Sequence, residues 1–165
     1  MEITGLPVHP LIVHAVVVLL PLSVLLALAF AFLPSWRWLT RWLTLACAVI
    51  GVVSVFIARQ SGQAFLESKP FLLEGDTPAR QHIMDHQDYA GLLFWASLLF
   101  LVVVVAAFFL LPAPTGLADG SLDHAGSTSA VAVRGLPVLL AVLGLATLVL
   151  CVLTGDAGAR TVWGS

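Results

Sequence analysis

Histidines are the side chains of this chain best suited to hold a metal ion or a haem. His9 and His14 stand at the start of the first long apolar segment, and His82 and His86 stand just before the third. Imidazole nitrogens are common ligands of zinc, copper and iron. These four residues are therefore the first candidates for a functional site.

The spacing of the histidines distinguishes the two pairs. His82 and His86 are four residues apart, so on a helix both would project from one face and could reach one ion. His9 and His14 are five apart and point in different directions, and His9, just before Pro10, is expected to precede the helix. His14 is expected inside the apolar segment, where an ionisable group is costly and often functional. For each histidine a structural role, hydrogen-bonded or facing water, remains the alternative.

A few other polar residues could support a histidine site. Arg59 could pair with Asp85 or with a propionate of a haem, or it could lie among lipid headgroups. Asp156 and Arg160 are four residues apart, the spacing of a surface ion pair, although Asp156 could instead accept a hydrogen bond that orients a histidine. No nucleophile, base and orienting group occur together, so a classical enzyme acting on a soluble metabolite is the least expected function.

The composition indicates an integral membrane protein. Of the 165 residues, 60% are hydrophobic and 10% are charged, whereas soluble domains carry about 25% charged residues. The net charge is −2 and the sequence has no cluster of basic residues, so nucleic acid is not an expected partner. The expected partner is the lipid bilayer.

Four apolar segments each have about the 20 residues that cross a bilayer as a helix. We therefore predict an all-α fold, a single domain over residues 1–165 that forms a bundle of four transmembrane helices with antiparallel up-down topology. The helices are expected at about 11–33, 42–65, 79–111 and 136–154, with a flexible loop over 112–134. Thr77 is a candidate N-cap for the third helix, with Pro78 in its first turn.

This topology brings together the start of the first helix, the end of the second, the start of the third and the end of the fourth. Four of the five histidines then share one membrane face with Arg59, Asp85, Asp156 and Arg160. The short turn with Arg37 and Arg41 lies on the other face, and positive residues favour the cytoplasm. We expect a multi-pass protein of the cell inner membrane with the histidine face outside the cytoplasm.

Several short motifs together resemble a bacterial membrane family catalogued as domain of unknown function 2231. They are His9-Pro-Leu-Ile-Val-His14, the segment from Gly62, His82 with His86, and Thr154-Gly-Asp-Ala-Gly-Ala. The resemblance covers essentially the whole chain. Some members of that family are joined to Rieske-type or cytochrome-type domains, so the resemblance implies a place near electron transfer, with respiratory or redox membrane proteins as partners.

Three functions remain open at this stage. A haem b could be bound axially by His14 and either His86 or His82, with His9 at the rim, for electron transfer. A Zn, Cu or Fe ion could instead be held by His82, His86 and either His14 or His9, with Asp85 or Asp156 in support, as in a metal-handling protein. The chain could also be a structural or assembly subunit of a membrane complex, and a homo-oligomer is open in every case.

Overall fold

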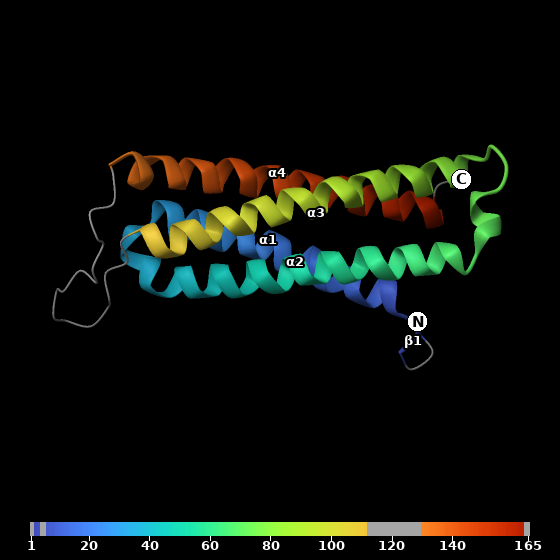
Figure 1. The fold of residues 1–165 in the computed structure, drawn as a ribbon, viewed down its shortest axis with the longest axis horizontal. Helices are drawn as coiled ribbons and strands as arrows, with labels where there is room; N and C mark the ends of the chain where they lie inside the picture. The colour runs from blue at the N-terminus through green and yellow to red at the C-terminus, as the bar shows by residue number, and fades with distance from the viewer. Residues whose placement is uncertain (1, 4–5, 112–129, 164–165) are drawn as a thin grey trace.

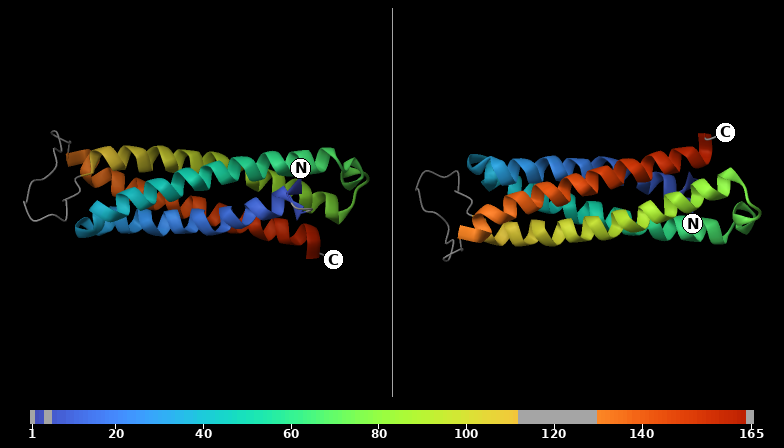
Figure 2. Two further views of the ribbon diagram at one scale, coloured as in Figure 1. Left: turned by 90° about the horizontal axis from the view of Figure 1, so that it is seen from below. Right: turned by 90° about the horizontal axis from the view of Figure 1, so that it is seen from above.

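The computed structural model describes residues 2–3, 6–111 and 130–163, and in this part the chain forms a bundle of four long α-helices (Figure 1). Consecutive helices run in opposite directions along the long axis of the bundle (Figure 2). Each is long and apolar enough to cross a membrane. The helices are α1 (Val8–Phe32), α2 (Arg37–Glu67), α3 (Pro78–Leu110) and α4 (Ala130–Trp163). The predicted all-α, four-helix fold is confirmed.

The remaining elements are short. The strands β1 (Glu2–Ile3) and β2 (Leu6–Pro7) pair in antiparallel fashion ahead of α1. The 3-10 turns η1 (Pro34–Trp36) and η2 (Pro70–Leu73) lie in the α1–α2 and α2–α3 connections. The α1–α2 connection is short, which keeps these two helices side by side.

Polar contacts fix two of the helix ends. The Thr77 side chain accepts a hydrogen bond from the backbone N–H of Arg80 at 3.2 Å, so the predicted cap of α3 is present. At the end of α1, the buried Arg37 donates from Nε to the carbonyl of Phe30 and from Nη2 to that of Ala31, both at 2.9 Å. The last carbonyls of a helix have no hydrogen-bond donor within that helix. Arg37, the first residue of α2, donates to two of them.

Three predicted helix spans were wrong. α2 begins at Arg37 rather than near residue 42, so Arg37 and Arg41 lie in a helix and not in a turn. α1 begins at Val8, so His9 lies in the helix rather than before it, and Pro10 occupies the first turn, where a missing N–H costs little. α4 extends well beyond 136–154 on both sides, so residues 130–134 are helical rather than part of a flexible loop. The rest of that predicted loop, 112–129, lies outside the described residues.

The helices pack as two hairpins, α1 with α2 and α3 with α4. Contacts between α1 and α4 and between α2 and α3 close the bundle, which leaves α1 and α3 diagonally opposed. Glycines allow close approach in the core, as small residues do between membrane helices. A Cβ built on Gly144 would lie 3.1 Å from Val24 Cγ1 and 3.4 Å from Phe100 Cε2.

Replacing Gly144 by alanine tests this packing. The added methyl meets a buried valine and a buried phenylalanine, so we expect Gly144→Ala to lower the free energy of unfolding in detergent by about 1–3 kcal/mol. Gly155→Ala on the same helix is the matched control, because nothing lies within 4 Å of its added Cβ. It should be neutral, or stabilising by up to about 1 kcal/mol. Equal effects of the two changes would contradict the packing described.

Candidate functional site

The four predicted helix ends share one end of the bundle, which carries both termini and the α2–α3 connection (Figure 1). His9 and His14 lie in the first turns of α1 at this end, and His82 and His86 lie in the first turns of α3. The topological prediction that four histidines gather at one end is therefore confirmed.

The imidazole of His9 is fixed to α2. Its Nδ1 lies 2.8 Å from the carbonyl oxygen of Ala58 and 3.3 Å from Oγ of Ser61. A carbonyl oxygen can only accept a hydrogen bond, so Nδ1 carries the proton and donates. The Ser61 hydroxyl donates in turn to the same carbonyl at 2.9 Å. The ring of His9 is thus held in one orientation.

The imidazole of His86 is fixed to α4 in the same way. Its Nδ1 donates to the carbonyl oxygen of Thr154 at 2.9 Å, which also makes Nδ1 the protonated nitrogen. Each helical hairpin therefore has a histidine near the start of its first helix that is anchored to a backbone carbonyl near the end of its second helix.

A glycine makes each of these contacts sterically allowed. Gly62 follows Ala58 by four residues, and Gly158 follows Thr154 by four. Residues four apart lie on the same face of a helix, so a side chain at either glycine would cover the carbonyl that the imidazole needs. A Cβ on Gly62 would lie 3.1 Å from Cε1 of His9, and one on Gly158 would lie 3.0 Å from Cε1 of His86.

The two anchored imidazoles come together from diagonally opposed helices. The ring centroids of His9 and His86 are 6.2 Å apart and the ring planes are at 87°. Among the described residues, both rings make their hydrogen bonds through Nδ1 only. In a neutral ring with a protonated Nδ1, Nε2 keeps its lone pair. The arrangement therefore brings two oriented, half-buried imidazoles close to each other.

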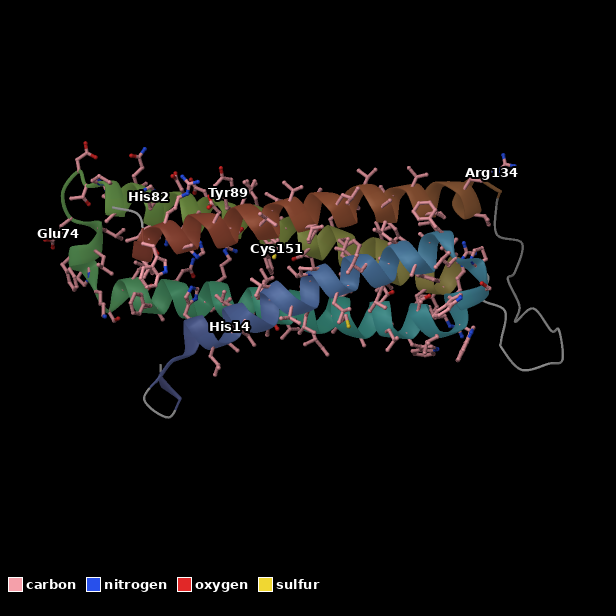
Figure 3. All side chains as sticks on the ribbon, turned by 180° about the vertical axis from the view of Figure 1, so that it is seen from behind. His14, Glu74, His82, Tyr89, Arg134 and Cys151 are labelled. Atoms are coloured by element: carbon pink, nitrogen blue, oxygen red, sulfur yellow. The ribbon has the colours of Figure 1, made fainter. Side chains whose placement is uncertain are left out.

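The histidine opposite His86 is His9, and not the predicted His14. Because α1 starts early enough to include His9, this residue is directed into the bundle, and five residues later the helix has turned by about 140°. His14 consequently lies on an exposed side of α1. Figure 3 shows His14 on α1, apart from His82 and Tyr89 on α3.

The predicted three-histidine ion site of His82, His86 and His14 is not assembled. Within residues 2–3, 6–111 and 130–163, no three His, Cys, Asp or Glu side chains lie close enough to hold one ion. His82 instead lines a pocket of about 290 Å³ between α3 and α4. The pocket is lined by His82, Asp85, Tyr89, Leu153, Asp156, Ala157 and Arg160.

The supporting polar residues take simpler roles than the sequence suggested. Arg160 donates from Nε and Nη2 to Oδ2 of Asp156 at 2.9 and 2.8 Å, and both side chains are exposed, so the pair is the expected surface ion pair. The carbonyl of Thr154, rather than Asp156, orients His86. Arg59 lies over the ring of Phe94, with Cζ 5.6 Å from the ring centroid.

Comparison with known families agrees with the motif-based resemblance. A family model described as a predicted membrane protein, DUF2231, matches residues 5–165. The chain belongs to the DUF2231 family. No curated protein and no solved structure matches it. Family membership and the four apolar helices together make this a multi-pass membrane protein in contact with the lipid bilayer.

The sequence analysis of this DUF2231 protein did not single out Gly62 and Gly158 as the residues against which the two histidine rings pack. Both lie in segments that carried the family resemblance, but the contacts that explain them come from histidines on other helices. A usable signal was present, because each hairpin has histidines early in its first helix and glycine in the polar end of its second helix. That pattern indicates a histidine–glycine contact only once it is known that α1 packs on α2 and α3 on α4.

The protonation of the two rings can be measured directly. In protein labelled with ¹⁵N in histidine, we expect the Nδ1 atoms of His9 and His86 to carry a proton, since both donate to carbonyls. Two-bond ¹⁵N–¹H correlation spectra identify the tautomer. A spectrum with a proton only on Nε2 in either ring would refute the hydrogen bonds described.

Adding a methyl group at one glycine should disturb only the histidine beside it. Gly158→Ala is expected to displace His86 and lose its hydrogen bond, which costs about 1–2 kcal/mol of stability. The ¹⁵N signals of His86 should shift while those of His14 stay in place. Gly91→Ala on α3 is the control, because its added Cβ meets nothing within 4 Å. Unchanged His86 signals in Gly158→Ala would rule out the proposed fit.

Proposed function

We propose that this DUF2231 protein binds a b-type haem through axial coordination by His9 and His86 and transfers electrons in the membrane. The observation that carries the proposal is the 6.2 Å separation of the two ring centroids. A metal bound by both Nε2 atoms at about 2.0–2.1 Å, with about 1.1 Å from each nitrogen to its ring centre, gives about 6.3 Å for opposed rings.

The number of protein ligands favours a haem over a bare ion. An ion bound by protein side chains alone usually needs three or four of them, and the described residues bring together only two imidazoles. A haem carries four nitrogen ligands of its own and requires only axial ligands from the protein. Facing helices of a four-helix bundle are a common place for such ligands.

The surroundings of the two rings suit this role. The carbonyls of Ala58 and Thr154 hold the Nδ1 protons, which fixes the rings and increases the basicity of the coordinating nitrogens. Gly62 and Gly158 leave the space that the rings occupy. Arg59, next to Ala58 on α2, provides a positive charge for a haem propionate.

The bound haem would supply reversible one-electron transfer at its iron, and the protein residues would hold and orient it. We place the histidine end outside the cytoplasm of the inner membrane, because Arg37 and Arg41 lie beside the membrane at the other end. Redox membrane proteins that reach that outer face are then the expected partners.

Absorption spectroscopy of the protein purified from haem-supplemented cells tests the proposal. We expect a Soret band in the wild type that disappears in His9→Ala and in His86→Ala, because each change removes one axial ligand. His14→Ala and His82→Ala are the matched controls and should retain the band.

Other outcomes decide against the proposal in distinct ways. A band lost in His14→Ala but kept in His9→Ala would support the pair predicted from the sequence. Stoichiometric zinc, copper or non-haem iron without a Soret band would favour metal handling. Absence of both haem and metal would favour a structural or assembly subunit.

A further inference from the structure

We propose that the pocket between α3 and α4 binds the hydroxylated ring of a membrane quinol. This inference rests on the proposed electron-transfer function and names a class of membrane molecule that the same end of the bundle would bind. The pocket, of about 290 Å³, is lined from α3 by His82, Asp85 and Tyr89 and from α4 by residues that include Ala157 and Arg160. Its size is close to the lower end of small-molecule sites.

The pocket adjoins His86 on both of its helices. On α3, Asp85 precedes His86 and Tyr89 follows it by less than one turn. On α4, Ala157 precedes Gly158, the residue against which the ring of His86 packs. A molecule in the pocket would therefore lie beside the helix segments that hold His86.

The charges and side chains around the pocket favour neither an anion nor a metal ion as its ligand. The guanidinium of Arg160 is already paired with Asp156 at 2.8 Å, so it offers no unbalanced positive charge to an anion. The carboxylate of Asp85 has no ion pair in the described part of the chain. That part also lacks any group of three residues able to hold a metal ion. An anion and a metal ion are both poor ligands for this pocket.

The hydrogen-bonding groups suit a molecule with hydroxyl groups. Asp85 accepts hydrogen bonds, neutral His82 accepts at one nitrogen and donates at the other, and the Tyr89 hydroxyl does both. The two hydroxyl groups of a quinol can donate to the first two residues, while Tyr89 donates to a quinol oxygen. Leu153 and Ala157 provide the apolar wall that an aromatic ring requires.

The location favours a ligand from the membrane. The pocket lies at the polar end of two helices long and apolar enough to span a bilayer. Towards the bilayer centre these helices expose Leu92 and Val149, which offer an apolar surface to an isoprenoid tail. Quinols are membrane-soluble molecules that combine such a tail with a dihydroxy ring.

Binding can be measured with decylubiquinol, a short-tailed quinol, kept reduced under nitrogen with the full-length protein in nanodiscs. In ¹⁵N-histidine spectra, the His82 signals should shift in a saturable way while the His14 signals do not. Loss of one hydrogen bond in Tyr89→Phe is expected to weaken binding by about tenfold. Asp85→Asn should weaken it as well, because an amide accepts less strongly than a carboxylate.

The control is Asp88→Asn, which removes an exposed carboxylate from the same helix, outside the pocket. It should bind decylubiquinol as the wild type does. Absence of saturable binding, or equal weakening in Asp88→Asn and Tyr89→Phe, would overturn the proposal.

Haem binding and quinol binding can be tested separately, because the Soret band reports the first and decylubiquinol affinity reports the second. His9→Ala should remove the Soret band and leave the affinity for decylubiquinol unchanged, because His9 does not line the pocket. Saturable binding in a protein without a Soret band would retain the pocket and reject the haem. A Soret band without quinol binding would do the reverse.

Discussion

The site depends on a hydrogen bond from an imidazole on one helix to a backbone carbonyl within the neighbouring helix. His9 makes this bond to Ala58 and His86 makes it to Thr154. Each bond links the two helices of a hairpin, determines which ring nitrogen is protonated, and leaves the other nitrogen available. In an apolar bundle such bonds are also favourable because little water competes for the donor.

Glycine is the sequence requirement that this interaction imposes. A side chain four positions after the accepting carbonyl would crowd the ring, and Gly62 and Gly158 leave that position open. Both glycines lie within helices, where glycine is intrinsically unfavourable by roughly 0.5–1 kcal/mol. Their helices nevertheless continue to Glu67 and Trp163, since packing in the bundle outweighs this cost.

The two hairpins are built on one plan. Val16, Leu20 and Ala27 are buried on α1, and Leu93, Ser97 and Val104 are buried on α3 at the same spacings after His9 and His86. Because the histidine, the carbonyl and the glycine recur in each hairpin, the two halves deliver equivalent rings from opposite sides. This internal repetition accounts for a site built around two matched imidazoles.

The sequence by itself determined the membrane character, the four helices and the gathering of four histidines at one end. These properties follow from apolar length, from local signals such as Thr77 with Pro78, and from the alternation of helix direction. Only the tertiary structure decided that His9 rather than His14 faces His86. Ring placement depends on where α1 begins and how it is rotated against its neighbours, and the partners of both rings are backbone atoms of other helices. Every residue has a backbone carbonyl, and packing decides which carbonyl each ring reaches. The glycines four residues later are the only part of this choice that can be read from the sequence.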